Sequence, residues 1–292
     1  MNGFVILDKK AGFTSFQSAA FIKRIYNEKK TGHTGTLDPM ATGVLPVALG
    51  AATRLIDFLP NHDKAYLARF RLGITTDTLD ATGTVTETRP VTASKDDVQA
   101  ILPRFLGEQQ QIPPMYSALK MDGKRLYELA RKGKEVERAA RWIHIFSIAL
   151  TEQTDENEYE IAVDCSKGTY IRSLVADVGE ALGCGAALTF LRRTRANGFC
   201  VEDARTEEEL AKDPAAALLP ADTPFSAFRA VTVTEKQAVR FYNGGALLRD
   251  RLKILTEPAV YRVYGPDGAF LGLGEVHSEE SAELTAIRVI HQ

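Results

Sequence analysis

The sequence predicts an α+β protein with a mixed, largely antiparallel sheet, flanking helices and a small β-rich C-terminal part. Apolar runs of strand length alternate with helical periodicity irregularly and with hairpins, unlike the regular order of a doubly wound fold. After residue 229 the pattern changes to short strands and turns, including a Pro-Asp-Gly turn at 266–268. A chain of 292 residues is long enough for one large and one small domain. We therefore expect domains at residues 1–228 and 229–292.

The expected elements follow from periodicity, caps and turns. Strands are predicted at 4–7, 44–49, 64–72, 143–150 and 159–165, with a polar loop or hairpin at 75–88. Helices are predicted at 15–26, 51–59, 95–105, 124–132 and about 172–182, the first of them capped by Thr14 or Ser15. Residues 214–228 predict a short helical excursion and linker. In the C-terminal part we expect strands at 231–233, 260–264, 269–275 and 284–290, with a helix at 235–243.

Composition and cysteine usage are those of a cytoplasmic globular protein. The N-terminal MNGFVILDKK has only a short apolar run before charge and does not resemble a signal peptide. No apolar stretch approaches the ~20 residues that a membrane span requires. Cys165, Cys184 and Cys200 are odd in number and lack zinc spacing, which indicates free thiols. We expect no membrane association and no metal.

Local charge differs from the overall charge. A net charge of -2 does not indicate a nucleic-acid partner, but residues 120–141 carry eight Lys or Arg against four acids. A second basic cluster consists of Lys23, Arg24, Lys29 and Lys30. The two clusters together favour a surface that faces phosphates, although either one alone is better interpreted as a solvated helix face.

One stretch combines conformational restriction with a single acidic side chain. It reads GHTGTLDPMATGVLP from Gly32 to Pro46 and continues into an apolar run. Pro39 biases Asp38 toward extended geometry and has no N–H, and the glycines allow a ligand or second chain to approach the backbone. These features indicate a rigid loop that presents Asp38. A turn in which Asp38 bonds only its own backbone has the same pattern, so the residues alone leave both interpretations open.

The same stretch resembles the signature of the TruB family of tRNA pseudouridine synthases, GHTGxLDPxAxGxLP. Four more stretches resemble motifs of that family in the expected order: KAY at 64–66, QQQIPPMYSALKMDGKRLYELARKG at 109–133, SKGTYIRSL at 166–174 and LRRTR at 191–195. Two positions depart from the family pattern. Lys10 stands where proline is usual, and residues 196–198 replace a common Gly-Pro pair. We expect these departures to affect only local loop conformation.

The resemblance implies isomerisation of uridine to pseudouridine at position 55 in the T-arm of tRNA. It implies a pseudouridine synthase sheet for residues 1–228 and a PUA-like RNA-binding domain for 229–292. The reaction needs no metal, redox group or nucleotide cofactor, and we expect no guide RNA. The expected partner is the T-arm stem-loop, which the protein would bind as a monomer.

The resemblance also assigns three catalytic residues. Asp38 would act at C1′ of the sugar, either by attacking it or by assisting proton removal, and the sequence leaves both routes open. Arg172 would keep that carboxylate ionised, because a nearby guanidinium favours the charged form. Tyr66 would stack on the base and is a candidate for moving a proton late in the reaction. Without the resemblance, a surface ion pair for Arg172 and a core position for Tyr66 would be the better interpretations.

Three further residues would bind the substrate. The uridine must leave the stack to reach the catalytic residues. Tyr170 and Leu191 would form walls of the pocket, and His33 would fill the space that the base vacates. By residue type alone, Leu191 is an ordinary core leucine. A lone histidine is usually structural, but its flanking by Gly32 and Thr34-Gly35 suggests that His33 is presented rather than buried.

Three alternatives stay open from the sequence. A glycoside or nucleoside hydrolase also acts at C1′ but generally pairs two carboxyl groups, and no second acid is evident at a matching loop. A guide-RNA-dependent pseudouridine synthase is a nearer alternative, against which the compact chain without basic tails argues. The protein could instead serve chiefly as an RNA-binding module that helps tRNA fold.

Overall fold

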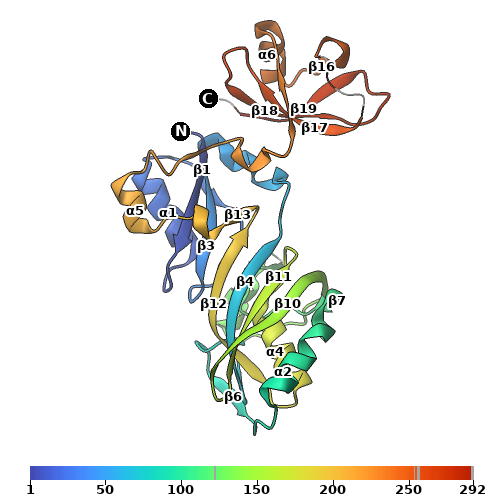
Figure 1. The fold of residues 1–292 in the computed structure, drawn as a ribbon. Coiled ribbons are helices and arrows are strands. Elements are labelled where there is room, and N and C mark those ends of the chain that lie inside the picture. Colours follow the sequence, from blue (N-terminus) through green and yellow to red (C-terminus); the bar gives the residue numbers. More distant parts are fainter. Residues whose placement is uncertain (122, 253, 255–256, 291–292) are drawn as a thin grey trace.

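The computed structural model of the protein describes residues 1–121, 123–252, 254 and 257–290. Within these residues a ten-stranded sheet forms the larger part of the molecule and a five-stranded sheet forms the C-terminal part (Figure 1). The large sheet contains β1 (Gly3–Lys9), β2 (Thr31–His33), β3 (Thr42–Leu49), β4 (Lys64–Leu72), β7 (Gly107–Gln111), β10 (Arg141–Asp155), β11 (Glu158–Cys165), β12 (Ala186–Ala196), β13 (Phe199–Cys200) and β14 (Leu219–Pro220).

The order of strands in the large sheet is β14-β1-β3-β12-β4-β11-β10-β7, with β2 on β3 and β13 on β12. The pairing of β3 with β12 is parallel, and the other pairings of this sheet in the described residues are antiparallel. This confirms the predicted mixed, largely antiparallel sheet. Two hairpins stand outside it, β5 (Ile74–Thr76) with β6 (Val85–Thr88) and β8 (Lys120–Met121) with β9 (Lys124–Arg125).

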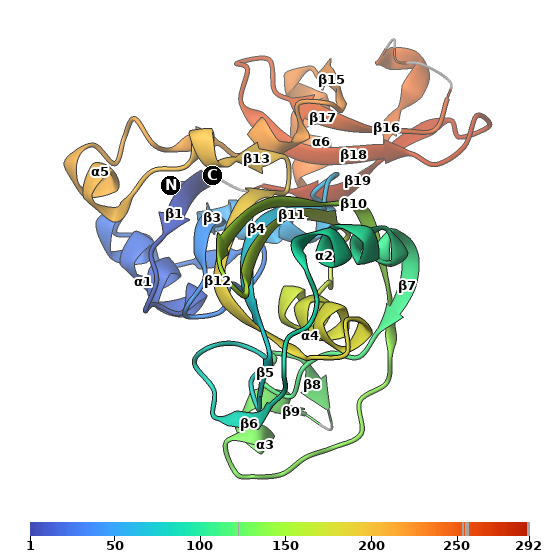
Figure 2. The same cartoon turned by 60° about the horizontal axis from the view of Figure 1, so that its bottom comes forward.

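Helices α2 (Lys95–Ile101) and α4 (Ile171–Ala181) cover one face of the β12-β4-β11-β10 half of the sheet (Figure 2). The other helices of the described residues are α1 (Ser15–Ile25), α3 (Leu126–Ala130), α5 (Glu207–Lys212) and α6 (Glu235–Tyr242), with 3-10 turns η1 (Gly50–Phe58), η2 (Leu102–Phe105), η3 (Val201–Asp203), η4 (Thr223–Phe225) and η5 (Arg249–Arg251). Along α4 the buried residues Ile171, Leu174, Val175 and Val178 recur at helical spacing and join the main core. No helix in the described ranges is long and apolar enough to cross a membrane.

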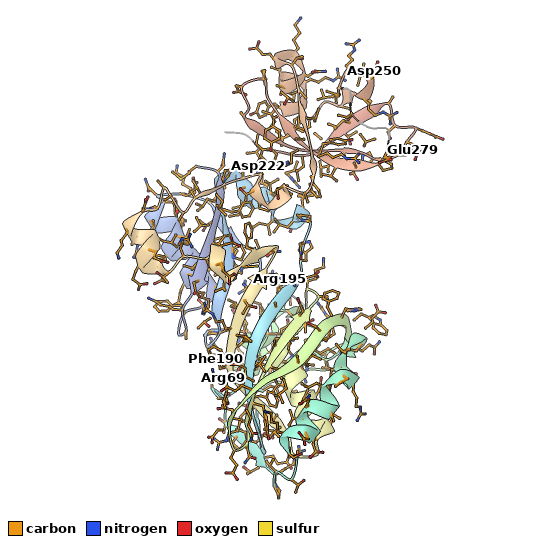
Figure 3. All side chains as sticks on the ribbon, viewed as in Figure 1. Arg69, Phe190, Arg195, Asp222, Asp250 and Glu279 are labelled. Carbon is orange, nitrogen blue, oxygen red and sulfur yellow. The ribbon has the colours of Figure 1, made fainter. Side chains whose placement is uncertain are left out.

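The opposite face of that half of the sheet carries polar and charged side chains. Arg69 and Phe190 lie side by side there, and Arg195 lies further along the sheet (Figure 3). The Arg69 guanidinium stacks over the Phe190 ring at 5.2 Å and pairs with Glu160 at 2.7 Å. The sheet therefore buries one face and exposes the other, which is the alternation that antiparallel sheets permit.

The C-terminal part is a five-stranded sheet with one helix. Its strands are β15 (Arg229–Thr232), β16 (Leu247–Leu248), β17 (Ala259–Tyr264), β18 (Phe270–Val276) and β19 (Glu283–Val289). An apolar cluster joins it to the large sheet, with Leu273 and Ile290 against Phe4 and Leu55. Asp222 lies between the two sheets (Figure 3), where it accepts a hydrogen bond from the Tyr264 hydroxyl.

Several local expectations are confirmed and others are wrong. Thr14 caps α1 through a capping box with Gln17, and the three cysteines are free thiols. The helix expected at 124–132 is shorter, because Lys124 and Arg125 pair with the preceding strand and helical geometry begins at Leu126. The region 51–59 forms a 3-10 helix. No α-helix forms within 214–228, where a single 3-10 turn occurs at 223–225 and α5 ends before it.

Candidate active site

A tightly anchored loop between β2 and β3 carries Asp38. Leu37 is buried, and its backbone N–H and carbonyl both bond the Ser15 hydroxyl of α1, at 2.8 and 3.1 Å. On the other side, the Lys9 ammonium donates to the carbonyls of Ala41 at 2.6 Å and Pro39 at 3.3 Å. The loop is thus held on both sides of Asp38, which gives its carboxylate a fixed position.

Arg172 holds that carboxylate through a bidentate contact. Its Nε lies 2.8 Å from Asp38 Oδ2 and its Nη2 donates to Oδ1 at 3.0 Å. The remaining donors of the guanidinium reach the carbonyls of Tyr116 at 2.7 Å and Thr78 at 2.9 Å. Arg172 lies in the first turn of α4 and is buried. It is therefore not the surface ion pair that its residue type alone suggests, and five-donor geometry fixes its orientation.

A second carboxylate, Asp80, lies behind Arg172. Asp80 Oδ2 is 3.6 Å from Arg172 Nη1, and its Oδ1 accepts hydrogen bonds from the Thr78 hydroxyl and from the backbone and hydroxyl of Thr82. Asp80 is buried. The sequence analysis missed it, because a segment of Asp, Thr and Gly looks like a solvated turn. The one signal was the density of such residues between 75 and 84.

Burial and charge act in opposite directions on Asp38. Desolvation raises the pKa of the Asp38 carboxyl above its ordinary value, and the Arg172 guanidinium counteracts part of this rise. The negative charge of Asp80 adds to the rise. Arg172 is therefore the group that keeps Asp38 available as a carboxylate in a partly apolar setting.

A cavity of about 310 Å³ opens in front of Asp38. It is lined by Gly35, Thr36, Leu37, Asp38, Lys64, Tyr66, Ser117, Ala118, Leu119, Gly168, Thr169, Tyr170, Ile171, Arg172 and Leu191. The structure thus brings five of the six predicted site residues to one cavity. His33, at the end of β2, is not among the lining residues. Its side chain is half-buried with a buried Nδ1 that lacks a partner in the described residues, so it is less exposed than the sequence suggests.

Two strands and the start of α4 supply much of the walls. Tyr66 on β4 and Leu191 on β12 are both buried and point to the helix-covered face. Tyr170 precedes α4, and its backbone is fixed by two hydrogen bonds with the Gln111 side chain, at 2.8 and 3.1 Å. Burial raises the pKa of Tyr66 to about 12 and also raises that of Tyr170. The phenols of Tyr66 and Tyr170 are therefore neutral at pH 7. For His33, burial is the main cause that lowers the pKa, and the charge of Arg193 lowers it further.

The cavity holds one carboxylate, two neutral phenols and apolar walls. In the described part of the chain, no group of three or more His, Cys, Asp or Glu side chains is arranged to hold a metal ion. A planar ring of nucleobase size could lie between Tyr66 and Leu191, because aromatic and aliphatic walls of this kind accept a flat π-system. The carboxylate would then face the atoms to which that ring is attached.

Comparison with known proteins connects this geometry to one family. Residues 23–171 match the model of the TruB family pseudouridylate synthase N-terminal domain. Residues 172–226 match the tRNA pseudouridylate synthase B C-terminal domain, and residues 230–290 match the C-terminal domain of pseudouridine synthase II TruB. The chain is 42% identical over 287 residues to tRNA pseudouridine synthase B of Pseudomonas putida strain F1, covering 96% of this chain and 93% of the relative. The chain belongs to the TruB family of tRNA pseudouridine synthases.

Other TruB relatives agree with this assignment. The Escherichia coli K12 tRNA pseudouridine synthase B is also 42% identical, over 293 residues that cover 96% of this chain and 92% of the relative. Among solved structures, a chain in the crystal structure of a Cbf5-Nop10-Gar1 complex is similar at 27% identity and a TM-score of 0.72, covering 98% of this chain and 83% of that one. This confirms the expected pseudouridine synthase fold, and the C-terminal sheet fits the expected PUA-like domain.

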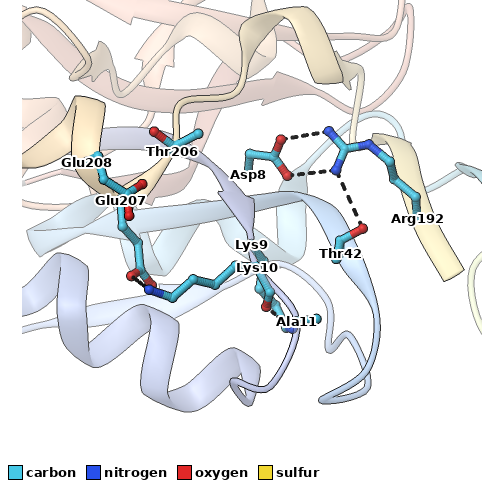
Figure 4. A pocket seen from close by; sticks show the side chains of 9 residues that line it. All are labelled: Asp8, Lys9, Lys10, Ala11, Thr42, Arg192, Thr206, Glu207 and Glu208. Carbon is cyan, nitrogen blue, oxygen red and sulfur yellow. Dashed lines mark hydrogen bonds and ion pairs between the residues drawn. The ribbon is translucent and has the colours of Figure 1, made fainter. Parts of the chain in front are cut away.

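At one of the two positions that depart from the TruB pattern, the side chain forms an ion pair with a neighbouring helix. Lys10, at the position where the family usually has proline, extends toward α5 and pairs with Glu207 at 2.7 Å. Both line a second cavity of about 260 Å³ (Figure 4). There Asp8 also makes a bidentate contact with Arg192, at 2.6 and 3.1 Å. An ion pair to a neighbouring helix thus accompanies the loss of the rigid proline ring at this turn.

The Lys and Arg residues of both basic clusters in this TruB-family chain are exposed, except for the half-buried Arg138. Lys23, Arg24, Lys29 and Lys30 are all exposed at and after α1, directly before β2. In the second cluster, Arg125 and Arg131 stack against the ring of Tyr127, at 5.9 and 5.5 Å. The segment that carries this cluster also supplies Ser117, Ala118 and Leu119 to the cavity wall. Cations therefore lie on the same segment as part of the cavity.

Proposed function

We propose that the protein isomerises uridine to pseudouridine at position 55 in the T-arm of tRNA, without a cofactor or guide RNA. The observation that carries this proposal is the single carboxylate of Asp38, held by Arg172 at a cavity whose other walls are Tyr66, Tyr170 and Leu191. Breaking and remaking one bond at C1′ requires an ionised acid next to the sugar and a shaped site for the detached base.

Asp38 acts at the sugar in this proposal. It attacks C1′ or assists proton removal from the sugar, and either route requires the carboxylate form. Arg172 secures that form against the desolvation that raises the pKa of Asp38. Because both guanidinium contacts to Asp38 are fixed by further bonds to the carbonyls of Tyr116 and Thr78, Asp38 needs little reorganisation when the base departs.

Tyr66 and Leu191 hold the flipped base between them. The uracil ring stacks on Tyr66, while Leu191 and Tyr170 limit how far it can turn before C5 faces C1′. Extruding a stacked base costs a few kcal/mol, which contacts in the pocket offset. We place His33 in the space that the uridine vacates, because it ends the strand that leads into the Asp38 loop.

The RNA backbone is gripped by the exposed basic clusters. Phosphate contacts of this kind give affinity that falls with salt, and the shape of the T-arm gives selectivity. We assign catalysis to residues 1–228 and additional RNA binding to residues 229–292. The protein acts as a monomer in the cytoplasm, with no metal in its mechanism.

Three alternatives are supported less well. A hydrolase acting at C1′ would place two carboxyl groups on the substrate, but Asp80 does not line the cavity and its Oδ1 is occupied by Thr78 and Thr82. Action as a folding module for tRNA would not require a buried Asp-Arg pair. A guided enzyme is the third alternative, and the 42% identity to relatives named tRNA pseudouridine synthase B, against 27% for a chain from a complex named with two further proteins, favours action by this chain alone.

The test compares wild type with Asp38→Asn on an isolated T-arm stem-loop, with no other RNA present. We expect wild type to form pseudouridine and to release no free uracil. Asp38→Asn should bind the stem-loop as tightly as wild type, but its turnover should be slower by at least about 10³-fold. The matched control is Asp57→Asn, which removes an exposed carboxylate. Free uracil would indicate a hydrolase, and conversion only with added RNA would indicate a guided enzyme. Cellular function retained by Asp38→Asn would favour the folding module.

A further inference from the structure

Arg193 is buried directly beside Tyr66. The two residues are paired across β12 and β4, so their side chains leave the sheet on the same face. Arg193 is 0% exposed. Its Nε donates to the carbonyl of Val44 at 2.7 Å and its Nη2 to the carbonyl of Gly35 at 3.2 Å. The guanidinium therefore lies next to Gly35 and Tyr66, two residues that line the cavity, and is fixed by backbone on both sides of the Asp38 loop.

The charge of Arg193 is not compensated by an acid. None of the ion pairs among the described residues includes it, and its Nη1 is buried without a hydrogen-bond partner. Arginine does not lose its proton in proteins, so it cannot escape this cost by becoming neutral. A buried, unpaired charge is among the most unfavourable features a fold can carry. Its retention next to the cavity indicates a use for the charge.

Tyr66 is the group that this charge acts on. Burial lowers the pKa of Arg193, and a negative charge on Tyr66 counteracts that change. Reciprocally, burial raises the pKa of Tyr66 to about 12, and Arg193 counteracts part of that rise. The nearby Lys64 does not take this place, because its ammonium donates to the His62 carbonyl at 3.0 Å. The Tyr66 phenol and the Arg193 guanidinium therefore already interact through their side chains, and a phenolate would turn this contact into an ion pair.

We propose that Arg193 is a positioning residue that stabilises a transient Tyr66 phenolate while Tyr66 moves a proton from C5 of the base to N1. The proposal rests on the proposed isomerase function and deepens it. The family resemblance already makes Tyr66 a candidate for moving a proton, and the inference adds Arg193 as the group that supports this step and gives a reason for its uncompensated burial.

The proton balance of the reaction requires such a relay. Pseudouridine formation breaks the N1–C1′ bond and forms the C5–C1′ bond, so N1 gains a proton and C5 loses one. The Tyr66 hydroxyl gives its proton to N1 of the detached base, whose bonding pair stays on N1. The resulting phenolate then takes the proton from C5 after the new bond has formed, and the C5–H pair restores the ring double bond. Tyr66 ends as a neutral phenol, with no other reactant consumed.

The test uses RNA whose target uridine carries hydrogen or deuterium at C5, in single-turnover measurements. We expect Arg193→Met to slow conversion by about 10²- to 10³-fold, as loss of a preorganised charge-stabilising donor does. Removal of the C5 proton should then limit the rate, so a primary deuterium isotope effect appears that exceeds that of wild type. Binding of the stem-loop should not change, because Arg193 is fully buried.

Arg192→Met is the matched control. Arg192 is the preceding residue on the same strand, pairs with Asp8 on the other face of β12 and lines the second cavity (Figure 4). Its loss should leave the isotope effect as in wild type. In a Tyr66→Phe background, Arg193→Met should add no further slowing, because the two changes then remove the same interaction.

The outcomes separate this inference from the proposed function. Slow conversion by Arg193→Met with the isotope effect of wild type would mean that Arg193 only supports the fold or the step at C1′, and the inference would be overturned. Unaltered conversion would overturn it as well. If thermal unfolding shows that Arg193→Met is unfolded, Arg193→Lys replaces it in the test. This variant retains the charge but lacks the planar guanidinium, so conversion should slow less and the isotope effect should still be raised. No conversion by wild type would overturn the proposed function itself.

Discussion

Two buried arginines hold the Asp38 loop, and their surroundings differ. Arg172 contacts the Asp38 carboxylate directly and has a second acid, Asp80, on its other side. Arg193 donates hydrogen bonds to the backbone carbonyls of Gly35 and Val44, lies beside Tyr66, and has no acid partner in the described residues. The first charge is already compensated in the resting protein, so it fixes a geometry. The second is uncompensated, so it can stabilise a negative charge that forms only during the reaction.

A third buried cation, Lys9, shows why the choice of residue matters. Its ammonium also bonds only carbonyls, those of Lys10, Pro39 and Ala41. Burial lowers the pKa of Lys9 to about 8, so this group can lose its proton when its charge becomes too costly. Arg193 cannot do so. A permanent charge beside Tyr66 therefore requires arginine, whereas anchoring the loop does not.

The largest loss of stability should come from removing Arg172, whose charge is compensated by Asp38 and Asp80. Arg172→Met would leave Asp38 and Asp80 close together without the cation between them. We expect a loss of about 3–5 kcal/mol in the free energy of unfolding, as for other broken buried pairs, together with loss of turnover. Chemical denaturation measures the first and pseudouridine formation the second.

The control for this variant is Arg229→Met, which removes an arginine from the exposed pair with Glu257. Exposed pairs contribute about 0–1 kcal/mol, so this change should be nearly neutral. An equal loss of stability in the two variants would show that compensation by two acids does not distinguish Arg172.

The next effect concerns the backbone under Arg193. Gly43 pairs with Arg193 across β3 and β12 and has a φ of +101°. A Cβ there would lie 2.2 Å from the Arg193 carbonyl oxygen. We expect Gly43→Ala to destabilise the protein by about 2–4 kcal/mol, since it combines an unfavourable φ with a backbone clash. Thermal unfolding measures the loss.

Gly107→Ala separates the two causes. Its φ is +85° but a Cβ there meets nothing within 4 Å. It should therefore show only the conformational part of the cost, about 1–2 kcal/mol. Equal losses at both glycines would mean that the close approach of β3 to Arg193 is not tightly packed.

The sequence predicted the surroundings of Arg172 better than those of Arg193, for a physical reason. The Asp38 loop is a local pattern, in which Pro39 and the neighbouring glycines restrict the backbone directly around the acid. Arg172 and Tyr66 lie in similarly distinctive motifs. Their convergence on one cavity depends on strand order and on the packing of α4, which periodicity does not encode, and only the resemblance to a family anticipated it.

Asp80 and Arg193 were not singled out, because what distinguishes them is burial and long-range pairing. Asp80 lies in a polar hairpin that looks solvated, and Arg193 reaches Tyr66 only through the register of β12 against β4. Long-range pairing also explains why the helix after Arg125 is shorter than expected. The spacing of the basic residues favours a helix, but Lys124 and Arg125 pair with β8 instead of beginning it. Tertiary pairing overrides local propensity in such short segments.

The pH dependence of turnover tests whether Arg172 controls the ionisation of Asp38. Because burial raises the pKa of Asp38, the carboxylate is lost on acidification at a pH above the ordinary value of 3.8. We expect the single-turnover rate to fall about tenfold per pH unit below that pKa. Arg172→Lys, which removes the bidentate contact, should move this decline to higher pH. A decline at or below 3.8 in wild type would show that Arg172 outweighs burial.

The smallest effect is a pH-dependent change in stability, which should occur for Lys9 but not for Arg193. In the folded protein the pKa of Lys9 is about 8, against an ordinary value of 10.5. Between these values the unfolded chain binds more protons at Lys9 than the folded one, so stability from this group rises with pH. Wild type should therefore gain about 1–2 kcal/mol relative to Lys9→Met between pH 8.5 and 10. The exposed Lys236→Met variant should show no such trend. Arg193→Met should show none from loss of its own proton, because arginine stays charged throughout this range. A gap between wild type and Lys9→Met that stays constant with pH would mean that Lys9, like Arg193, keeps its charge beneath the loop.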